Sequence, residues 1–384
     1  MAEGDQVVLK LVHTADWHLG LRFPSFAEED RPQLSRARLA AVERLLELAR
    51  RMAADGVLCA GDLFDEPDPA AEWWEGLLAA LTTHGRAEIP VFLLPGNHDP
   101  LVPGSVWQPT HPFRRQLPDF AHVVDRDDFE WAFGEEAVLY AAPCRSQAGQ
   151  RDLALSLPAR APGDDRVRIG MVHGSTVDIK GFANNFPIAR DAVAQRGLDY
   201  LAIGDTHGFR EVPPGARPPT VYPGTPEPTG FGETDAGHVA LVFFSRDRRV
   251  TLRKERVATW RWAERTVTDL AGLRAVRDAE DLTRTVLRLT LDLALPPAEF
   301  DEAERILREL RGTEAAHGRV GVLQVQRREL VLDTSGVEQA FADLPGVLQE
   351  VARRLRTVEA DASEEGGVAR EALSHLYRLT RELR

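Results

Sequence analysis

Five short segments of the sequence carry acidic, imidazole or amide side chains that could bind metal ions. They are Asp16-Trp17-His18, Gly61-Asp62, Gly96-Asn97-His98-Asp99, His173-Gly174 and Gly204-Asp205-Thr206-His207. Together they offer carboxylate, imidazole and amide groups without a thiolate, a ligand set that suits Mn²⁺, Fe²⁺, Zn²⁺ or Mg²⁺ better than a structural zinc site. Ions held in this way commonly activate water for hydrolysis. The segments therefore predict a metal centre without thiolate ligands.

No one of these segments is specific by itself. An Asp-x-His triplet often occurs by chance, and a histidine at a strand end is usually a hydrogen-bonded loop or core residue. Each of the five segments, however, directly follows a predicted strand. Five such placements along one chain favour a shared site over coincidence.

The predicted strands that precede the segments are short apolar runs at 7–13, 57–60, 91–94, 167–172 and 198–203. Apolar residues with helical spacing occupy 34–53 and 70–81, between the first three runs. Strands that alternate with helices indicate an α/β layered fold. In open α/β sheets, side chains at the carboxyl ends of strands gather in one crevice. The fold class thus explains how distant segments could form a single site.

The pattern changes after residue 262. Apolar and polar residues alternate strictly over 285–293, a helical pattern follows, and another strand is predicted at 320–325. This is a β-α-β module, and helical spacing returns from residue 337 to the end of the chain. We therefore predict a first domain at 1–262, a smaller domain at 275–335 and C-terminal helices at 336–384.

Composition limits the location and the partners of the protein. The 384 residues are 43% hydrophobic and 28% charged, which is ordinary for a globular protein. The start of the chain is not typical of a signal peptide, and no apolar run approaches the roughly 20 residues of a membrane-spanning helix. A cytoplasmic protein without a membrane partner is expected. The net charge of −13 argues against a protein that binds nucleic acid with its whole surface.

The order of the five segments resembles the signature of calcineurin-like metallophosphoesterases. Longer strings resemble the branch of SbcD-type DNA-repair exonuclease subunits: HTADWHLG at 13–20, GDLFD at 61–65 and PGNHD at 95–99, followed by YPGT at 222–225 and FGE at 231–233. The resemblance implies an α/β fold, a four-layer α-β-β-α sandwich with a smaller C-terminal β-α-β capping domain and terminal helices. It covers about residues 8 to 245; the rest resembles the family in layout only.

The resemblance also implies a role for each site residue. Seven side chains would bind metal: Asp16, His18, Asp62, Asn97, His173, Asp205 and His207. Asp62 would bridge two divalent ions, with Asp16, His18 and His207 on one side and Asn97 and His173 on the other. His98 would face the scissile phosphate as the catalytic residue and would not bind metal.

One position departs from the pattern of the family. The last motif is commonly Gly-His-x-His, whereas this chain has Asp205 where the first histidine would be. A carboxylate makes the site harder and more negative, which favours Mn²⁺ or Mg²⁺. Mn²⁺ is the expected ion, with Mg²⁺, Fe²⁺ or Zn²⁺ as alternatives.

Two enzymatic functions compete. The first is a DNA exonuclease or endonuclease in DNA repair, with an SbcC-type coiled-coil ATPase as partner and a homodimer allowed. The second is a phosphodiesterase for small molecules or cyclic nucleotides, which the acidic charge would not hinder. A scaffold without activity is disfavoured because every ligand position and His98 carry competent groups. The arginines at 353, 354 and 356 indicate either a solvated helix face or a face that docks onto the partner.

Overall fold

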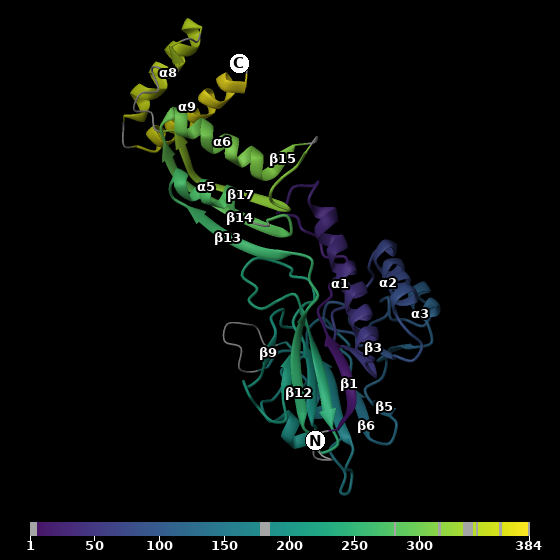
Figure 1. The fold of residues 1–384 in the computed structure, drawn as a ribbon. Coiled ribbons are helices and arrows are strands. Elements are labelled where there is room, and N and C mark those ends of the chain that lie inside the picture. Colours follow the sequence, from purple (N-terminus) through teal and green to yellow (C-terminus); the bar gives the residue numbers. More distant parts are fainter. Residues whose placement is uncertain are drawn as a thin grey trace. The chain divides into compact units, whose positions relative to one another are not determined.

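The computed structural model describes residues 6–176, 185–279, 282–313, 316–332, 341–342, 345–360 and 363–382. The chain divides into two compact units, Met1–Trp260 and Arg261–Arg384 (Figure 1). The sequence predicted a change of domain at 262. No helix among the described residues is both long and apolar enough to cross a lipid bilayer.

The first unit contains two six-stranded sheets. The first sheet has the strand order β12-β11-β1-β2-β3-β4. Its strands are β1 (Val7–Thr14), β2 (Gly56–Cys59), β3 (Val91–Leu93), β4 (Ala121–Val123), β11 (His238–Ser245) and β12 (Val250–Arg256). Helices α1 (Arg31–Arg51) and α2 (Ala71–His84) pack on one face, where Val42 and Leu77 join the same buried cluster as Val57. Apolar residues at helical spacing in α1 make this contact continuous.

The second sheet has the order β5-β6-β7-β8-β10-β9. Its strands are β5 (Phe129–Phe133), β6 (Ala137–Ala141), β7 (Val167–His173), β8 (Tyr200–Gly204), β9 (Arg210–Glu211) and β10 (Thr220–Tyr222). The outer face is covered by the short helices η2 (Ala154–Ser156) and α4 (Ala192–Arg196), with Leu157, Val193 and Ile203 in one cluster. A further short helix, α3 (Pro112–Gln116), packs Phe113 into the core of the first sheet.

The two sheets face each other across a shared apolar core. Leu11 and Phe92 of the first sheet belong to the same buried cluster as Ile169 and Tyr200 of the second. Strands β2, β6, β7 and β8 are buried along their whole length, which is why the sequence shows them as mostly apolar runs, interrupted in β7 by the buried Arg168. The predicted α-β-β-α layering is confirmed.

Parallel pairing brings the ends of the central strands to one edge of each sheet. Thr14 of β1 pairs with Cys59 of β2, which pairs with Leu93 of β3. In the second sheet, His173 at the end of β7 pairs with Gly204 at the end of β8. The five candidate segments follow these strands, and they therefore lie together at the carboxyl ends of the central strands.

The second unit is built on a parallel three-stranded sheet, β13-β14-β17. Its strands are β13 (Arg261–Val267), β14 (Thr285–Leu295) and β17 (Val322–Leu332). Helices α5 (Leu270–Asp278) and α6 (Pro297–Arg311) pack against this sheet. Two short strands, β15 (Gly312–Thr313) and β16 (Ala316–His317), form a hairpin. The alternating leucines of β14 lie in this core, as the sequence predicted. Residues 336–340 of the predicted C-terminal helices lie outside the described residues.

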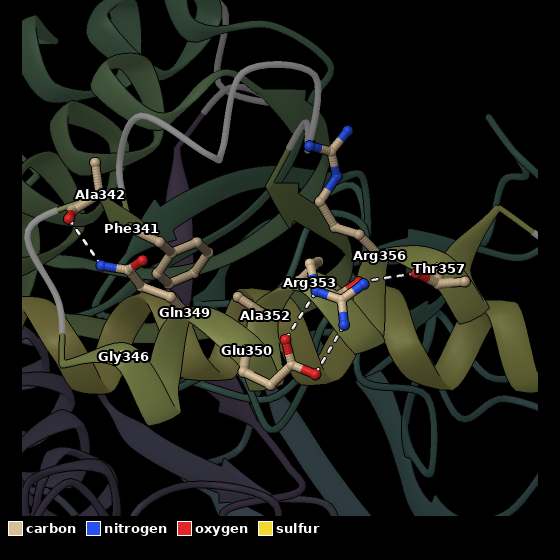
Figure 2. A pocket seen from close by; sticks show the side chains of 9 residues that line it. All are labelled: Phe341, Ala342, Gly346, Gln349, Glu350, Ala352, Arg353, Arg356 and Thr357. Carbon is tan, nitrogen blue, oxygen red and sulfur yellow. Dashed lines mark hydrogen bonds and ion pairs between the residues drawn. The ribbon is translucent and has the colours of Figure 1, made fainter.

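Two helices end the chain, α8 (Gly346–Glu359) and α9 (Glu364–Glu382). A hollow beside α8 is lined by Phe341 and Ala342 and by residues of the helix that include Gln349, Arg353 and Arg356 (Figure 2). Along α8, Arg353 and Arg354 both donate to the carboxylate of Glu350 at 2.8 Å. These pairs between neighbouring turns are those of a solvated helix face.

Candidate metal centre

The loops that follow the strands are bonded to one another through their backbones. The amide of Asp16 donates to the carbonyl of Gly61, and the amide of His18 donates to the carbonyl of Asp62, each at 3.0 Å. The Asp62 carboxylate in turn accepts from the amide of His98 at 2.8 Å. The ends of β1, β2 and β3 therefore form a single framework that holds the side chains.

Backbone strain is concentrated at the same place. Four predicted ligands have a positive φ that residues other than glycine rarely adopt: Asp16 (55°), His18 (43°), Asp62 (54°) and Asp205 (108°). Such conformations cost about 1–3 kcal/mol each and persist where the surrounding contacts impose them. Strained residues cluster at functional sites, and this pattern supports one here.

Two glycines are required by the close packing of these loops. A Cβ atom at Gly96 would overlap the backbone nitrogen and Oδ1 of Asp62. A Cβ atom at Gly61 would overlap the imidazole of His173. Both glycines belong to the predicted motifs, and their role is to let neighbouring ligand loops touch.

A buried arginine holds the first loop from behind. Arg38 of α1 donates to the carbonyl of Trp17 at 2.6 Å, to that of Asp16 at 3.1 Å and to that of Glu227 at 2.9 Å. The side chain is 1% exposed, and burial lowers the pKa of the guanidinium to about 10, so it stays charged. The sequence does not single out Arg38, because α1 carries several other arginines and the partners of Arg38 lie far away along the chain.

The first cluster of candidate ligands is Asp16, His18 and His207, whose ligand atoms lie within 4.8 Å of one another. Nε2 of His18 lies 3.2 Å from Nε2 of His207. The opposite ring nitrogens face carboxylates: Nδ1 of His207 is 2.7 Å from Glu233, and Nδ1 of His18 is 3.2 Å from Asp65. With the protons on Nδ1, two lone pairs point at each other, an arrangement that a cation between them stabilises.

The second cluster joins Asp16 and Asp62 to His173. Nε2 of His173 lies 2.9 Å from Oδ1 of Asn97 and 3.3 Å from Oδ2 of Asp62. Nδ1 lies 2.8 Å from the carbonyl oxygen of Ala60, which can only accept, so this nitrogen carries the proton. When Nε2 carries no proton, three acceptor atoms converge there without a donor, and the residues present then fit a bound cation.

Electrostatics also favour positive charge in the second cluster. Burial raises the pKa of the Asp16 carboxyl to about 7. Burial would also raise the pKa of Asp62, but the adjacent His173 outweighs it and holds that pKa below its usual range. For His173, burial lowers the pKa, yet Asp62 outweighs this and raises it to about 10. A proton on His173 thus supplies the charge that a metal ion would bring.

Asp205 lies beside the predicted ligand Asp16. Its carboxylate accepts a hydrogen bond from Ser175, and its backbone amide donates to the Asp16 carboxylate at 3.0 Å. Among the described residues it belongs to none of the three-residue groups that could hold an ion. The structure thus brings together six of the seven predicted ligands, and metal binding by Asp205 stays a prediction.

His98 stands at the open side of the centre. Its imidazole makes an edge contact with His18, with ring centroids 4.7 Å apart, and 46% of its side chain is exposed. Nδ1 lies 3.2 Å from the carbonyl oxygen of Asp65. A substrate could therefore reach this imidazole, as its predicted catalytic role requires.

Two acidic residues of the sequence motifs lie near the clusters, and no role was predicted for them. Asp65 and Glu233 face the imidazoles of His18 and His207, and carboxylates in that position orient metal-binding histidines. Asp99 is fully buried and joins two loops instead, since it accepts from the amides of Leu63 and Gly96.

Comparison with known proteins places the chain in a family. Residues 9–209 match the calcineurin-like phosphoesterases. The uncharacterized metallophosphoesterase YhaO of Bacillus subtilis is 26% identical over 285 residues, which is 73% of this chain and 68% of that protein. The D subunit of the nuclease SbcCD from Escherichia coli is 25% identical, and the alignment covers 97% of this chain and 98% of that protein.

Among solved structures, TT1561 of Thermus thermophilus is 15% identical with a TM-score of 0.39, covering 66% of this chain and 100% of that one. The family match takes in all five candidate segments completely, since the last of them ends at His207. The two clusters have the ligand chemistry that the family requires, because its members use a dinuclear site of divalent metal ions. This chain belongs to the calcineurin-like phosphoesterase family of metal-dependent hydrolases.

Proposed function

We propose that the chain is a two-metal nuclease of the SbcD type that hydrolyses DNA phosphodiesters in DNA repair in the cytoplasm. The observation that carries this proposal is the alignment with a component of a nuclease over nearly the whole length of both chains. The relative YhaO shares less of its length and has no stated substrate. A minimal phosphoesterase has no evident need for the second unit. The alignment with the nuclease subunit extends over this unit as well.

In this proposal Asp16, His18 and His207 hold one ion. Asn97 and His173 hold the other, and Asp62 lies between them. When bound, two divalent ions supply an activated water and stabilise negative charge on the phosphate. Mn²⁺ is the proposed ion, with Mg²⁺, Fe²⁺ or Zn²⁺ as alternatives, and Asp205 is proposed to add negative charge beside the second ion.

His98 is proposed as the catalytic residue. Its backbone amide is bonded to Asp62 and its Nδ1 lies against the carbonyl of Asp65, so the ring has a fixed place beside the first cluster. From there it can stabilise or protonate the oxygen of the departing sugar. A positioned general acid contributes roughly 10²–10⁴-fold to a rate.

The acidic charge of the chain requires a source of DNA affinity outside its average surface. Basic side chains that displace counterions supply most of the affinity of DNA-binding proteins. We propose an SbcC-type coiled-coil ATPase as the partner, and dimerisation as a second source of affinity. Val347 and Val351 on α8 are 76% and 41% exposed, which supports this helix as the docking element.

The alternative is a phosphodiesterase for small molecules or cyclic nucleotides, which the net charge of −13 favours. One assay separates the two functions. Purified protein with Mn²⁺ is incubated with end-labelled duplex and single-stranded DNA and with bis(4-nitrophenyl) phosphate, with and without the ATPase. His98→Ala controls for contaminating nuclease. Cleavage of DNA that the variant loses supports the proposal; turnover of the small ester alone overturns it.

A further inference from the structure

A cavity of about 460 Å³ opens directly beside the first metal cluster. It lies between the loop after β8 and the segment 231–235, and its lining includes His207, Phe209, Arg210, Phe231, Glu233 and Asp235. Pockets for small ligands have volumes of roughly 300–1,000 Å³. His207 and Glu233 belong both to this lining and to the candidate metal site, so a ligand in the cavity would adjoin the reacting phosphate.

Two half-buried phenylalanines form apolar walls, and each is supported from outside the cavity. Phe209 packs against the core between the sheets. The ring of Phe231 stacks on that of Phe26, with centroids 6.2 Å apart and an angle of 18° between the planes. Rings that are already held in place are suited to stacking with a planar ligand, because little side-chain freedom is lost when the ligand binds.

The charged groups of the lining argue against a second phosphate as the ligand. Three carboxylates line the cavity: Glu233 is bonded to His207, Asp235 to Lys254 at 2.6 Å, and Asp205 to Ser175. An anion would be repelled by them. Arg210 is exposed, and among the described residues no carboxylate forms an ion pair with it. A neutral ring that stacks on phenylalanine beside a guanidinium fits this combination.

We propose that this cavity binds the nucleobase of the nucleotide whose phosphate is hydrolysed, with Phe209 and Phe231 as stacking surfaces and Arg210 at its mouth. The inference rests on the proposed function, because it takes the substrate to be a nucleotide phosphodiester. A base in the cavity cannot remain paired in a duplex, so the nucleotide is bound unpaired, as in a single strand or a frayed end. Stacking tolerates every base, so no strong sequence preference is expected.

Two chromogenic esters with the same leaving group test the pocket: 4-nitrophenyl thymidine 5′-phosphate, which carries a base, and methyl 4-nitrophenyl phosphate, which does not. The measured quantity is the ratio of their kcat/KM values with Mn²⁺. The wild-type protein is expected to prefer the thymidine ester. Phe209→Ala and Phe231→Ala should each lower this ratio by roughly 5- to 100-fold, mainly through KM. A loss of this size corresponds to the free energy of stacking one base on an aromatic ring.

Phe120→Ala is the matched control, because this half-buried phenylalanine precedes β4 and lies at the opposite edge of its sheet from the candidate segments. It should leave the ratio unchanged. Phe209→Leu keeps the apolar volume without the ring and replaces Phe209→Ala if that variant does not fold. A wild-type ratio near one, or an unchanged ratio in the Phe209 and Phe231 variants, overturns the inference. A protein that prefers the thymidine ester but cleaves no DNA supports the base pocket and refutes the nuclease.

Discussion

The carboxylate of Glu233 fixes the imidazole of His207: Oε1 lies 2.7 Å from Nδ1. The same carboxylate accepts a hydrogen bond from the amide of Thr229 at 2.9 Å, so it cannot easily turn away. His207 is thereby held with Nε2 toward His18. The pair shows how a residue that binds no metal itself can determine the geometry of a metal site.

Glu233→Gln should weaken metal binding. The amide preserves the shape of the side chain but removes the negative charge that holds the proton on Nδ1, and such changes behind a metal ligand typically cost about 10–100-fold in affinity. Isothermal titration of the metal-free protein with Mn²⁺ measures the effect. Glu211→Gln, which changes an ion pair with Arg217 on the same unit, is the control. Equal affinities for both variants would show that Glu233 does not orient the ligand.

His98→Ala should lower kcat for phosphodiester hydrolysis by about 10²–10⁴-fold and leave Mn²⁺ binding intact. The reason is that the variant keeps the backbone amide that donates to Asp62, so the ligand framework is preserved. Steady-state kinetics measure the loss of kcat, and a titration with Mn²⁺ measures metal binding. A matched control is His84→Ala, which changes a contact with Glu47 in the first unit. A kcat close to that of the wild-type protein would remove His98 from the chemistry.

Gly96→Ala should disrupt the metal site through a steric clash, without removing any metal ligand. The added methyl group would overlap the backbone and carboxylate of Asp62, so one of the two loops must move. Overpacking of this kind typically destabilises a protein by about 1–3 kcal/mol. Reduced Mn²⁺ stoichiometry and a lower urea midpoint are expected, whereas Gly346→Ala, where a Cβ meets no atom within 4 Å, should change neither. A variant that binds metal normally would show that the loops are not packed as described.

Buried His13 should make a contribution to the stability of the metal-free protein that falls as the pH is lowered from 7 to 5. Burial lowers the pKa of His13 to about 3, below its ordinary value of 6.5. Below pH 6.5 the imidazole of His13 is protonated in the unfolded chain but stays neutral in the folded chain. The stability contributed by neutral His13 is therefore fully present above pH 6.5 and is lost progressively below it. The slope for one such group is about 1.4 kcal/mol per pH unit. Urea denaturation should show a smaller pH dependence for His13→Gln; an unchanged dependence would contradict the assignment.

Much of the site was predictable because its motifs are local. Each predicted ligand directly follows an apolar run long enough to be recognised as a strand, as Asp62 follows β2 and His173 ends β7. Burial on both faces makes these strands continuous in the sequence. Strict alternation made β14 equally visible. The order of sheet layers followed from the family resemblance rather than from any one pattern.

Other features were not predictable because they depend on contacts between distant residues. Arg38 donates a hydrogen bond to Thr225, which lies 187 positions away, and the sequence around either residue does not indicate this contact. The supporting roles of Asp65 and Glu233 likewise appear only once the loops are folded. The short strands β4 and β10 have three residues each, too few to show a period, whereas β3 was recognised because Leu94 extends its apolar run.

The central claim is that side chains from separate strands form one pocket for two divalent ions. Titration of the metal-free protein with Mn²⁺, followed by electron paramagnetic resonance, tests it most directly. We expect two ions per chain with the spectrum of a coupled pair, and loss of the coupling in Asp62→Asn. Binding of a single ion, or two ions with uncoupled spectra in the wild-type protein, would contradict it.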